Sequence, residues 1–127
     1  MFNQVNYKEF KGALKLAQQV SDLVKNATSV WEELEDADIF FKDYYLDYEN
    51  QCGFAVNFNG NLTSVFSLVR GNGNYIMVNA KKAGATNLDC FDGYLPSYYK
   101  RHGFKVVRRE ANWTPGEPDV CYMALDE

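Results

Sequence analysis

One segment, residues 64–104, constrains the fold of this chain most, because it reads as strand, glycine turn, helix, strand and a tyrosine-rich helix that ends in Gly-Phe. Residues 64–69 form a β-branched and aromatic run of strand length, and two glycines follow it within residues 70–74. Residues 75–83 have the apolar spacing of a helix that stops at Gly84, a residue suited to a helix C-terminus. Residues 87–91 can then return as a strand parallel to the first.

The glycine turn in this segment is the candidate ligand site. A helix that begins directly after a strand and a tight turn directs several backbone N–H groups at one point, where its dipole favours negative charge. Such a point suits a phosphate, although a plain tight turn would use the same glycines. The turn and its flanks comprise Leu68, Val69, Arg70, Gly71, Asn72, Gly73, Asn74 and Tyr75.

Length and composition predict a single domain over residues 1–127. Hydrophobic residues are 46% and aromatic residues 16% of the chain, which is enough apolar surface for a compact core. No run approaches the length of a membrane span, and charged residues precede any segment that a signal peptide would need. We therefore expect a cytoplasmic protein that does not associate with membranes. The three cysteines lie far apart in strand-like segments, which predicts free thiols and no metal site.

The formal net charge of −4 conceals an asymmetry along the chain. Residues 32–49 contain eight acidic side chains and one basic side chain, whereas residues 51–109 contain eight basic and two acidic ones. This division could place an anionic ligand on the second half and a cationic one beside the first, but a solvated acidic helix face gives the same pattern. A pI near 5.0 argues against nucleic acid as a partner.

The N-terminal region predicts an amphipathic helix. Apolar side chains recur at three- and four-residue spacing from Phe10 to Val20, with Val24 as a further position on the same face. Asn3 or Asn6 can cap this helix at its N-terminus. We expect it to pack against the rest of the domain.

A second helix and an aromatic strand are expected next. Ser29 and Glu32 have the spacing of a capping box, which predicts a shorter, acidic helix through about Asp36. The aromatic stretch over residues 39–47 alternates in part and favours a strand, with a helix as the alternative.

An Asn-Gly pair at residues 59–60 lies between two alternating apolar runs, which is a strong hairpin signal because both turn residues accept positive φ. Residues 105–110 and 120–125 predict two further strands, joined by a proline-containing loop. The predicted fold is therefore an α/β (α+β) domain. Its sheet is mixed, twisted and mainly antiparallel, with a central βαβ unit and helices on both faces.

Two motifs resemble those of the GNAT acetyltransferase superfamily. In that family a strand ends in an Arg/Gln-x-x-Gly-x-Gly/Ala turn that cradles the pyrophosphate of acetyl-CoA; residues 70–75 match it, except that Tyr75 replaces the small last residue. The second motif, Tyr-x-x-x-Gly-Phe at a helix end, is satisfied by residues 99–104. The family often has Asn seven positions before this Tyr; here that residue is Asp92, and Pro96 is expected to start the helix. The resemblance covers roughly the C-terminal 75 residues and extends to small GNAT-like proteins of bacteria and phages.

The resemblance implies acetyl-CoA as co-substrate, held at residues 68–75 and near Asp92. It also implies that Tyr99 is the general acid that protonates the CoA thiolate, and a packing role for this side chain is the alternative. The glutamate that the family often places on the strand before the turn has no counterpart in residues 64–69. A water chain, or one of Asp89, Asp92 and Glu49, would then act as the base.

We therefore expect an N-acyltransferase that uses acyl-CoA, with acetyl-CoA as the first choice, and acylates a primary amine by direct attack. The acceptor would be a small molecule or a protein, held near the acidic residues 32–49. The alternative is a catalytically inactive GNAT-like module that modulates a protein partner, which would suit a phage-encoded protein, because Tyr75 crowds the turn and no base is evident. A third hypothesis is a structural subunit that self-associates through residues 40–48, so a homodimer is also considered.

Overall fold

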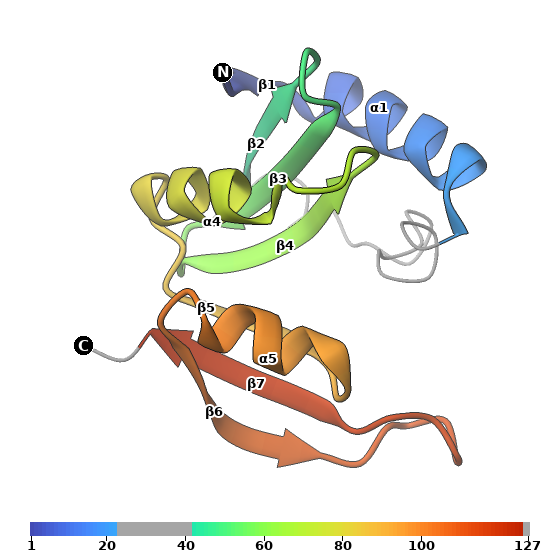
Figure 1. Ribbon diagram of the computed structural model, residues 1–127, viewed down its shortest axis with the longest axis vertical. Helices are drawn as coiled ribbons and strands as arrows, with labels where there is room; N and C mark the ends of the chain where they lie inside the picture. The colour runs from blue at the N-terminus through green and yellow to red at the C-terminus, as the bar shows by residue number, and fades with distance from the viewer. Residues whose placement is uncertain (23–41, 126–127) are drawn as a thin grey trace.

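The computed structural model describes residues 1–22 and 42–125, which form one seven-stranded sheet and three helices (Figure 1). The strand order is β1-β2-β3-β4-β5-β7-β6, and β4 and β5 are the parallel neighbours in an otherwise antiparallel sheet. The strands are β1 (Asn3–Val5), β2 (Lys42–Asp47), β3 (Cys52–Asn57), β4 (Asn61–Ser67), β5 (Asn87–Phe91), β6 (Phe104–Glu110) and β7 (Val120–Leu125). The predicted mixed sheet with a central βαβ unit is confirmed.

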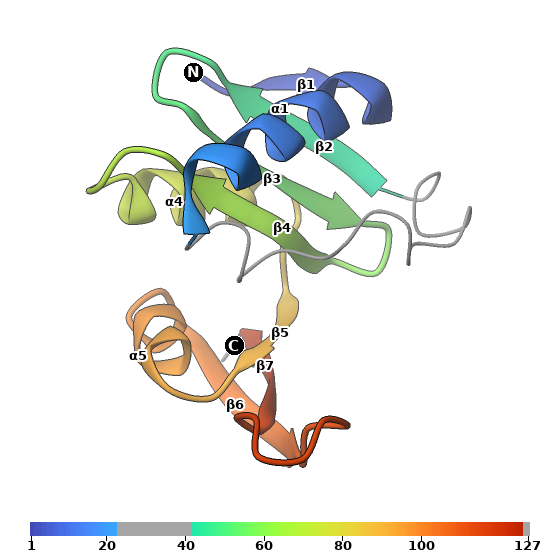
Figure 2. The ribbon, with the colours of Figure 1, turned by 90° about the vertical axis from the view of Figure 1, so that its right-hand side faces the viewer.

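Helices cover both faces of the sheet, as expected (Figure 2). On one face, α1 (Tyr7–Val20) packs its Phe10 and Leu14 against β2, β3 and β4. On the other face, α4 (Gly73–Lys82) and α5 (Tyr94–Lys100) cover a larger core. That core comprises Cys52, Phe54, Val56, Leu62, Ile76, Met77, Ala80, Ala85, Leu88, Tyr99, Phe104 and Met123.

The N-terminal helix begins where its cap predicts. The side chain of Asn6 accepts a hydrogen bond from the Glu9 backbone N–H at 2.8 Å, which satisfies one of the free donors of the first turn. Val20, expected on the buried face, is 67% exposed at the helix end. The positions predicted for a second helix, 29–36, and Val24 lie outside the described residues.

Two strands depart from the sequence expectation. The aromatic stretch is a strand over residues 42–47, which rules out a helix there, and the rest of that stretch, 39–41, is not described. Strand β1 was not expected: Asn3 lies in it and pairs with Leu46 of β2, so only Asn6 acts as a helix cap. Three residues are too few to show the period-2 pattern that identifies a strand.

The predicted hairpin joins β3 to β4, and Gly60 adopts φ +79° in its turn. Beyond the hairpin, β5 and β7 have the expected bounds, and three other boundaries differ from the expected ones by two residues. Strand β4 ends at Ser67, α4 begins at Gly73, and α5 begins at Tyr94 instead of Pro96. Pro96 fits inside the first helical turn because its missing N–H would have no helical acceptor there.

The sheet divides into two halves where β4 and β5 diverge, and we call this division the parting. These strands are paired at two positions, Asn61 with Asn87 and Leu62 with Leu88, and β4 then bulges while the strands diverge. The bulge lies opposite Phe54, and Ser64 within it adopts φ +53°, a conformation that non-glycine residues rarely take. The parting leaves α4 on one half of the sheet and α5 on the other (Figure 1). No helix among the described residues is long and apolar enough to cross a membrane.

Candidate functional site

The loop between β4 and α4 is tied to the neighbouring turn between β2 and β3. The Leu68 backbone N–H donates to the Gln51 carbonyl at 2.9 Å. The Asn72 side-chain amide donates to the Asn50 carbonyl at 2.9 Å and to the Ser67 hydroxyl at 3.0 Å. These bonds place the start of α4 beside the end of β4, where the sheet parts.

The N-terminus of α4 has no side-chain cap among the described residues. Asn72 occupies the cap position, but its side chain bonds to the neighbouring turn instead of the helix. The first turn closes with the Ile76 N–H bonded to the Asn72 carbonyl at 2.9 Å. The N–H groups of residues 73–75 therefore have no acceptor within the helix. Together with the helix dipole, they make this end of α4 suitable for an anion.

The two glycines of the turn are required for different reasons. Gly71 adopts φ +90°, which disfavours any side chain, although the space around it is open. Gly73 has an ordinary helical conformation, but a Cβ atom there would lie 2.8 Å from Cε1 of Tyr98. Residue 71 thus needs to be glycine because of its backbone conformation, and residue 73 because a tyrosine ring from α5 fills the space of a side chain.

Tyr75 does not direct its side chain into the turn. Its hydroxyl donates to the buried carboxylate of Asp47 at 2.5 Å, and its ring stacks on Phe2 at a centroid distance of 5.0 Å. Burial, followed by the hydrogen bond to Asp47, raises the pKa of Tyr75 to about 12. The large residue at the last position of the glycine motif is therefore accommodated by the core beside β2.

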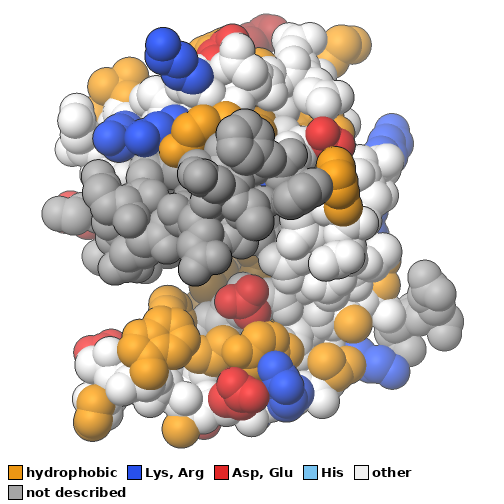
Figure 3. Space-filling model, turned by 180° about the vertical axis from the view of Figure 1, so that it is seen from behind, with side chains coloured by type: hydrophobic (Ala, Val, Ile, Leu, Met, Phe, Trp, Pro, Cys, Tyr) orange, Lys and Arg blue, Asp and Glu red, His pale blue; other side chains and the backbone are white. Residues whose placement is uncertain are grey.

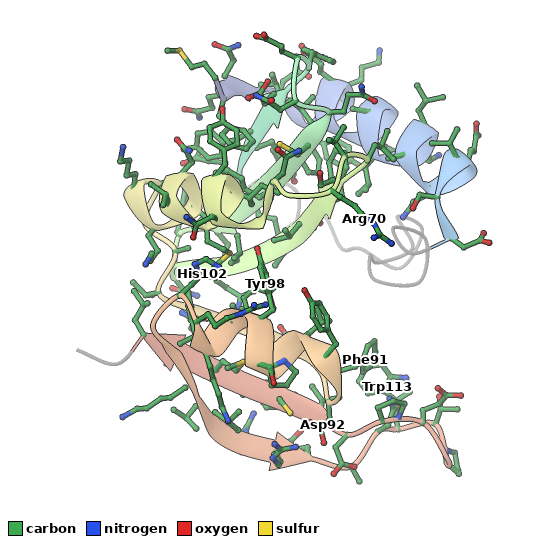
Figure 4. All side chains as sticks on the ribbon, viewed as in Figure 1. Arg70, Phe91, Asp92, Tyr98, His102 and Trp113 are labelled. Carbon is green, nitrogen blue, oxygen red and sulfur yellow. The ribbon has the colours of Figure 1, made fainter. Side chains whose placement is uncertain are left out.

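The remaining candidate residues of the loop are exposed. Leu68 and Val69 lie beyond the end of β4 with 38% and 44% of their surfaces exposed. Arg70 extends from the loop away from the sheet (Figure 4). Asn74, in the first turn of α4, is also exposed.

Asp92 lies at the far end of the parting, directly after β5. Its carboxylate accepts from the Gly93 N–H at 3.0 Å and forms an ion pair with Arg109 at 2.7 Å. The backbone hydrogen bond from Gly93 and the bond from Arg109 lower the pKa of Asp92. Asp92 is about 43% exposed in its side chain and is separated from the α4 N-terminus by the width of the parting (Figure 4).

Tyr99 and Asp89 lie on opposite faces of β5. Tyr99, 8% exposed, packs with Leu88 and Phe104 on the face that α5 covers, and burial raises its pKa, so that it is protonated at neutral pH. Asp89 is the first β5 residue after the last parallel pair and alternates with Leu88 and Cys90, so it projects to the other face. It is exposed, yet partial desolvation of its carboxylate raises its pKa.

The face of the C-terminal half-sheet opposite α5 is aromatic and charged. Asp89 is paired there with Tyr122 of β7, and the Arg108 guanidinium lies over the Tyr122 ring at 4.2 Å. Phe91 at the end of β5 is 40% exposed, and Trp113 in the loop between β6 and β7 is 79% exposed. Seen from behind, apolar, acidic and basic side chains are interspersed on this half of the molecule (Figure 3).

Two of the described acids between residues 42 and 49 have structural partners. Asp47 is 2% exposed and accepts from the backbone and side chain of Asn50 at 3.0 and 2.8 Å. Asp43 accepts from the Gln4 side chain at 3.1 Å. Glu49 lies exposed in the turn between β2 and β3, and residues 32–38 of the acidic stretch lie outside the described residues.

Tyr98 is the site residue that the sequence motifs did not indicate. Its hydroxyl donates to the Gly73 carbonyl at 2.9 Å and so bridges α5 to the first turn of α4 (Figure 4). A signal did exist: Tyr94, Tyr98 and His102 recur every four residues, the spacing that aligns side chains along one face of a helix, and His102 lies two residues past the end of α5. These rings do contact one another, with centroid distances of 6.3 Å and 5.1 Å from Tyr98.

Comparison with known proteins identifies the fold. No protein-family model matches the chain, and no curated protein sequence matches it. Among solved structures, an acyl-CoA N-acyltransferase from Pseudomonas aeruginosa aligns over 99% of each chain with 16% identity and a TM-score of 0.70. A "putative N-acetyltransferase" from Lactobacillus plantarum aligns over 98% of this chain and 97% of its own, with 14% identity and a TM-score of 0.56. The chain therefore has the GNAT fold, as its two motifs led us to expect.

Proposed function

We propose that this protein is an N-acyltransferase that takes its acyl group from acyl-CoA, with acetyl-CoA as the preferred donor. The observation that supports it most is the combination of a parted sheet and an uncapped helix N-terminus at one place. A long, polar-ended molecule such as acyl-CoA can thread through such a parting with its phosphates at the helix. The similar fold of an acyl-CoA N-acyltransferase adds support.

In this proposal the pyrophosphate binds at the start of α4. The N–H groups of Gly73, Asn74 and Tyr75 would donate to its oxygens, and the positive φ of Gly71 gives the preceding loop the shape to admit them. Arg70, exposed on the same loop, would add positive charge. The exposed Leu68 and Val69 would line the path of the pantetheine arm toward the parting.

The chemistry divides between the two faces of β5. The amine nitrogen attacks the thioester carbonyl carbon and loses a proton to Asp89 on one face. The carbon–sulfur bond then breaks, and the leaving thiolate takes a proton from Tyr99 on the other face. A phenol with a raised pKa is fully protonated at neutral pH, as a proton donor to sulfur must be. A backbone N–H at the β4 bulge would polarise the carbonyl.

We choose Asp89 as the base over the other two carboxylates. Asp92 forms an ion pair with Arg109, and its lowered pKa makes it a weaker proton acceptor. Glu49 lies in a turn between β2 and β3, on the other half of the sheet from β5. Asp89 is beside the parting, and its raised pKa strengthens it as a base.

The acceptor in this proposal is a primary amine that reaches the sheet from the side of Asp89. Tyr122 is paired with Asp89 on that side of the sheet, and the half-exposed Phe91 follows two residues later on the same side of β5. Aromatic rings together with a carboxylate favour a cation over an anion.

The experiment that tests the proposal is a thiol-release assay with acetyl-CoA and a panel of primary amines and amine-bearing peptides. Amine-dependent release of free CoA, together with a product heavier than the amine by one acetyl group, would support the activity. Absence of release with every amine, from a protein that still binds acetyl-CoA, would favour a second candidate, a CoA-binding module without catalysis. The observation that favours that candidate is the absence of any carboxylate on β4.

A further inference from the structure

Tyr98 joins the two halves of the sheet on the side where α4 and α5 lie. Its hydroxyl donates to the Gly73 carbonyl at 2.9 Å, across the parting from α5 to α4. A second bridge between the two halves, from the Lys81 ammonium to the His102 carbonyl at 3.0 Å, lies at the other end of α4 and is exposed. Tyr98 is therefore the bridge at the end of α4 where the free N–H groups lie.

The ring of Tyr98 occupies the space that a side chain at residue 73 would need. A Cβ atom at Gly73 would lie 2.8 Å from Cε1 and 3.0 Å from the hydroxyl oxygen of Tyr98. The ring is held from both sides, by Tyr94 stacked at 6.3 Å and by His102 edge-on at 5.1 Å. It cannot withdraw from Gly73 without disturbing these contacts.

The hydrogen bond adds to the restraint that the helix itself places on the peptide that links Gly73 to Asn74. The carbonyl and the N–H of a trans peptide point in opposite directions in one plane. When Tyr98 holds the Gly73 carbonyl, it therefore also restrains the direction of the Asn74 N–H, one of the free donors of the first turn. A hydrogen bond to the carbonyl further polarises the N–H of the same peptide.

From these contacts we propose that Tyr98 is a positioning residue for the phosphate-binding turn, and that Gly73 is glycine because of the Tyr98 ring and not because of the ligand. The inference rests on the proposed binding of acyl-CoA. Tyr98 holds the first turn of α4 at a set distance from α5 and aims its N–H groups, before the ligand arrives. Pre-organisation of this kind lowers the cost of binding.

A double-substitution cycle tests the origin of Gly73 without any ligand. Gly73→Ala in the wild-type background should lower the melting temperature, because the methyl group collides with the Tyr98 ring. In a Tyr98→Ala background the same change should leave the melting temperature unchanged or raise it, since alanine favours helix more than glycine does. An equal loss in both backgrounds would overturn the inference.

Titration with CoA tests the positioning role. Tyr98→Phe keeps the ring and removes the hydrogen bond, so the Kd for CoA should rise roughly three- to tenfold. Tyr94→Phe, on the same helix, is the matched control and should bind as the wild type does. We expect weaker CoA binding in Tyr98→Phe than in the wild type. We also expect that adding Gly73→Ala to Tyr98→Ala does not weaken CoA binding further.

Two other outcomes contradict the inference. Unchanged affinity in Tyr98→Phe, even with a lower melting temperature, would show that Tyr98 only supports the fold. Tighter binding would show that Tyr98 obstructs the site and must move aside. If the wild type itself fails to bind CoA, the proposed function fails, and the ligand part of the inference fails with it; the stability cycle then still decides why residue 73 is glycine.

Discussion

The side chains of Asn61 and Asn87 meet at the point where the sheet begins to part. The Asn61 amide donates to the Asn87 side-chain oxygen at 2.7 Å, and the two residues form the first parallel pair of β4 and β5. Asn87 in turn donates to the Asn59 carbonyl at 3.0 Å and so binds the hairpin turn as well. These side-chain bonds reinforce a junction that has two paired positions.

Asn87→Ala should therefore destabilise the protein more than an ordinary surface substitution does. It removes the bonds to Asn61 and to the Asn59 carbonyl, and we expect the free energy of unfolding to fall by roughly 1–2 kcal/mol. Denaturant unfolding measures this loss. Asn59→Ala is the control, since the carbonyl at residue 59 is retained; a loss as large in the control would assign the effect to the turn instead of the junction.

The buried carboxylate of Asp47 should make stability depend on pH in the acid range. Burial alone would raise its pKa, but hydrogen bonds from the terminal amine, Tyr75 and Asn50 outweigh it and hold the pKa well below the usual range. A lowered pKa in the folded state means that this stabilisation is present above the unfolded pKa, about 4, and is lost as the pH falls below it.

Asp47→Asn should remove that dependence. We expect the variant to be less stable than the wild type by roughly 1–3 kcal/mol at pH 7. The gap should narrow at pH 3, when measured by urea unfolding at both pH values. Asp43→Asn serves as the control, because Asp43 bonds to the exposed Gln4 side chain. A gap between Asp47→Asn and wild type that stays constant from pH 7 to pH 3 would contradict this account.

Tyr99→Phe tests the proton donor. If Tyr99 protonates the leaving thiolate, its loss should lower kcat roughly tenfold or more while the Kd for acetyl-CoA stays nearly the same. Because burial raises the pKa of Tyr99, the wild-type activity should not decline from its ionisation at mildly alkaline pH. Tyr48→Phe, at an exposed tyrosine that follows β2, is the comparison. Undiminished kcat in Tyr99→Phe would leave Tyr99 with a packing role.

Asp89→Asn tests whether Asp89 is the base, because the change should lower activity without lowering stability. Folding raises the pKa of the Asp89 carboxyl, so the charged carboxylate destabilises the folded state. This destabilisation is fully present above the pKa of the folded state, and it disappears as the pH falls from there to the pKa of the unfolded state. The neutral amide should therefore keep or slightly raise the melting temperature at pH 7, while kcat/KM for the amine drops and loses its acid limb. Unaltered kcat/KM would exclude Asp89 as the base.

Local signals predicted the frame of this fold well. The Asn-Gly turn at residue 60 and the helix end at Gly84 lie where expected, and both glycines adopt positive φ, at +79° and +101°. These features depend on residues a few positions apart, which the sequence displays directly. The order strand, helix, strand was enough to predict that β5 runs parallel to β4.

The contacts that shape the site could not be read in the same way. Tyr75 meets Asp47 across 28 positions, and Tyr98 meets Gly73 across 25. Such pairs are brought together by the fold, and a single sequence has no periodicity that links them. A glycine that makes room for a distant ring therefore looks the same, in sequence, as a glycine that makes room for a phosphate.

The most direct test of the account is calorimetric titration of acetyl-CoA into Asn74→Asp, beside the wild type. A carboxylate in the first turn of α4 favours the helix, so the melting temperature should be kept, but it repels a pyrophosphate at that turn. Asn3→Asp, on β1, introduces the same charge far from the turn. We predict micromolar binding to the wild type and to Asn3→Asp, and binding at least roughly tenfold weaker to Asn74→Asp, because the added carboxylate repels the pyrophosphate. No binding to the wild type at millimolar acetyl-CoA, or equal binding to all three proteins, would contradict the placement of acyl-CoA at α4.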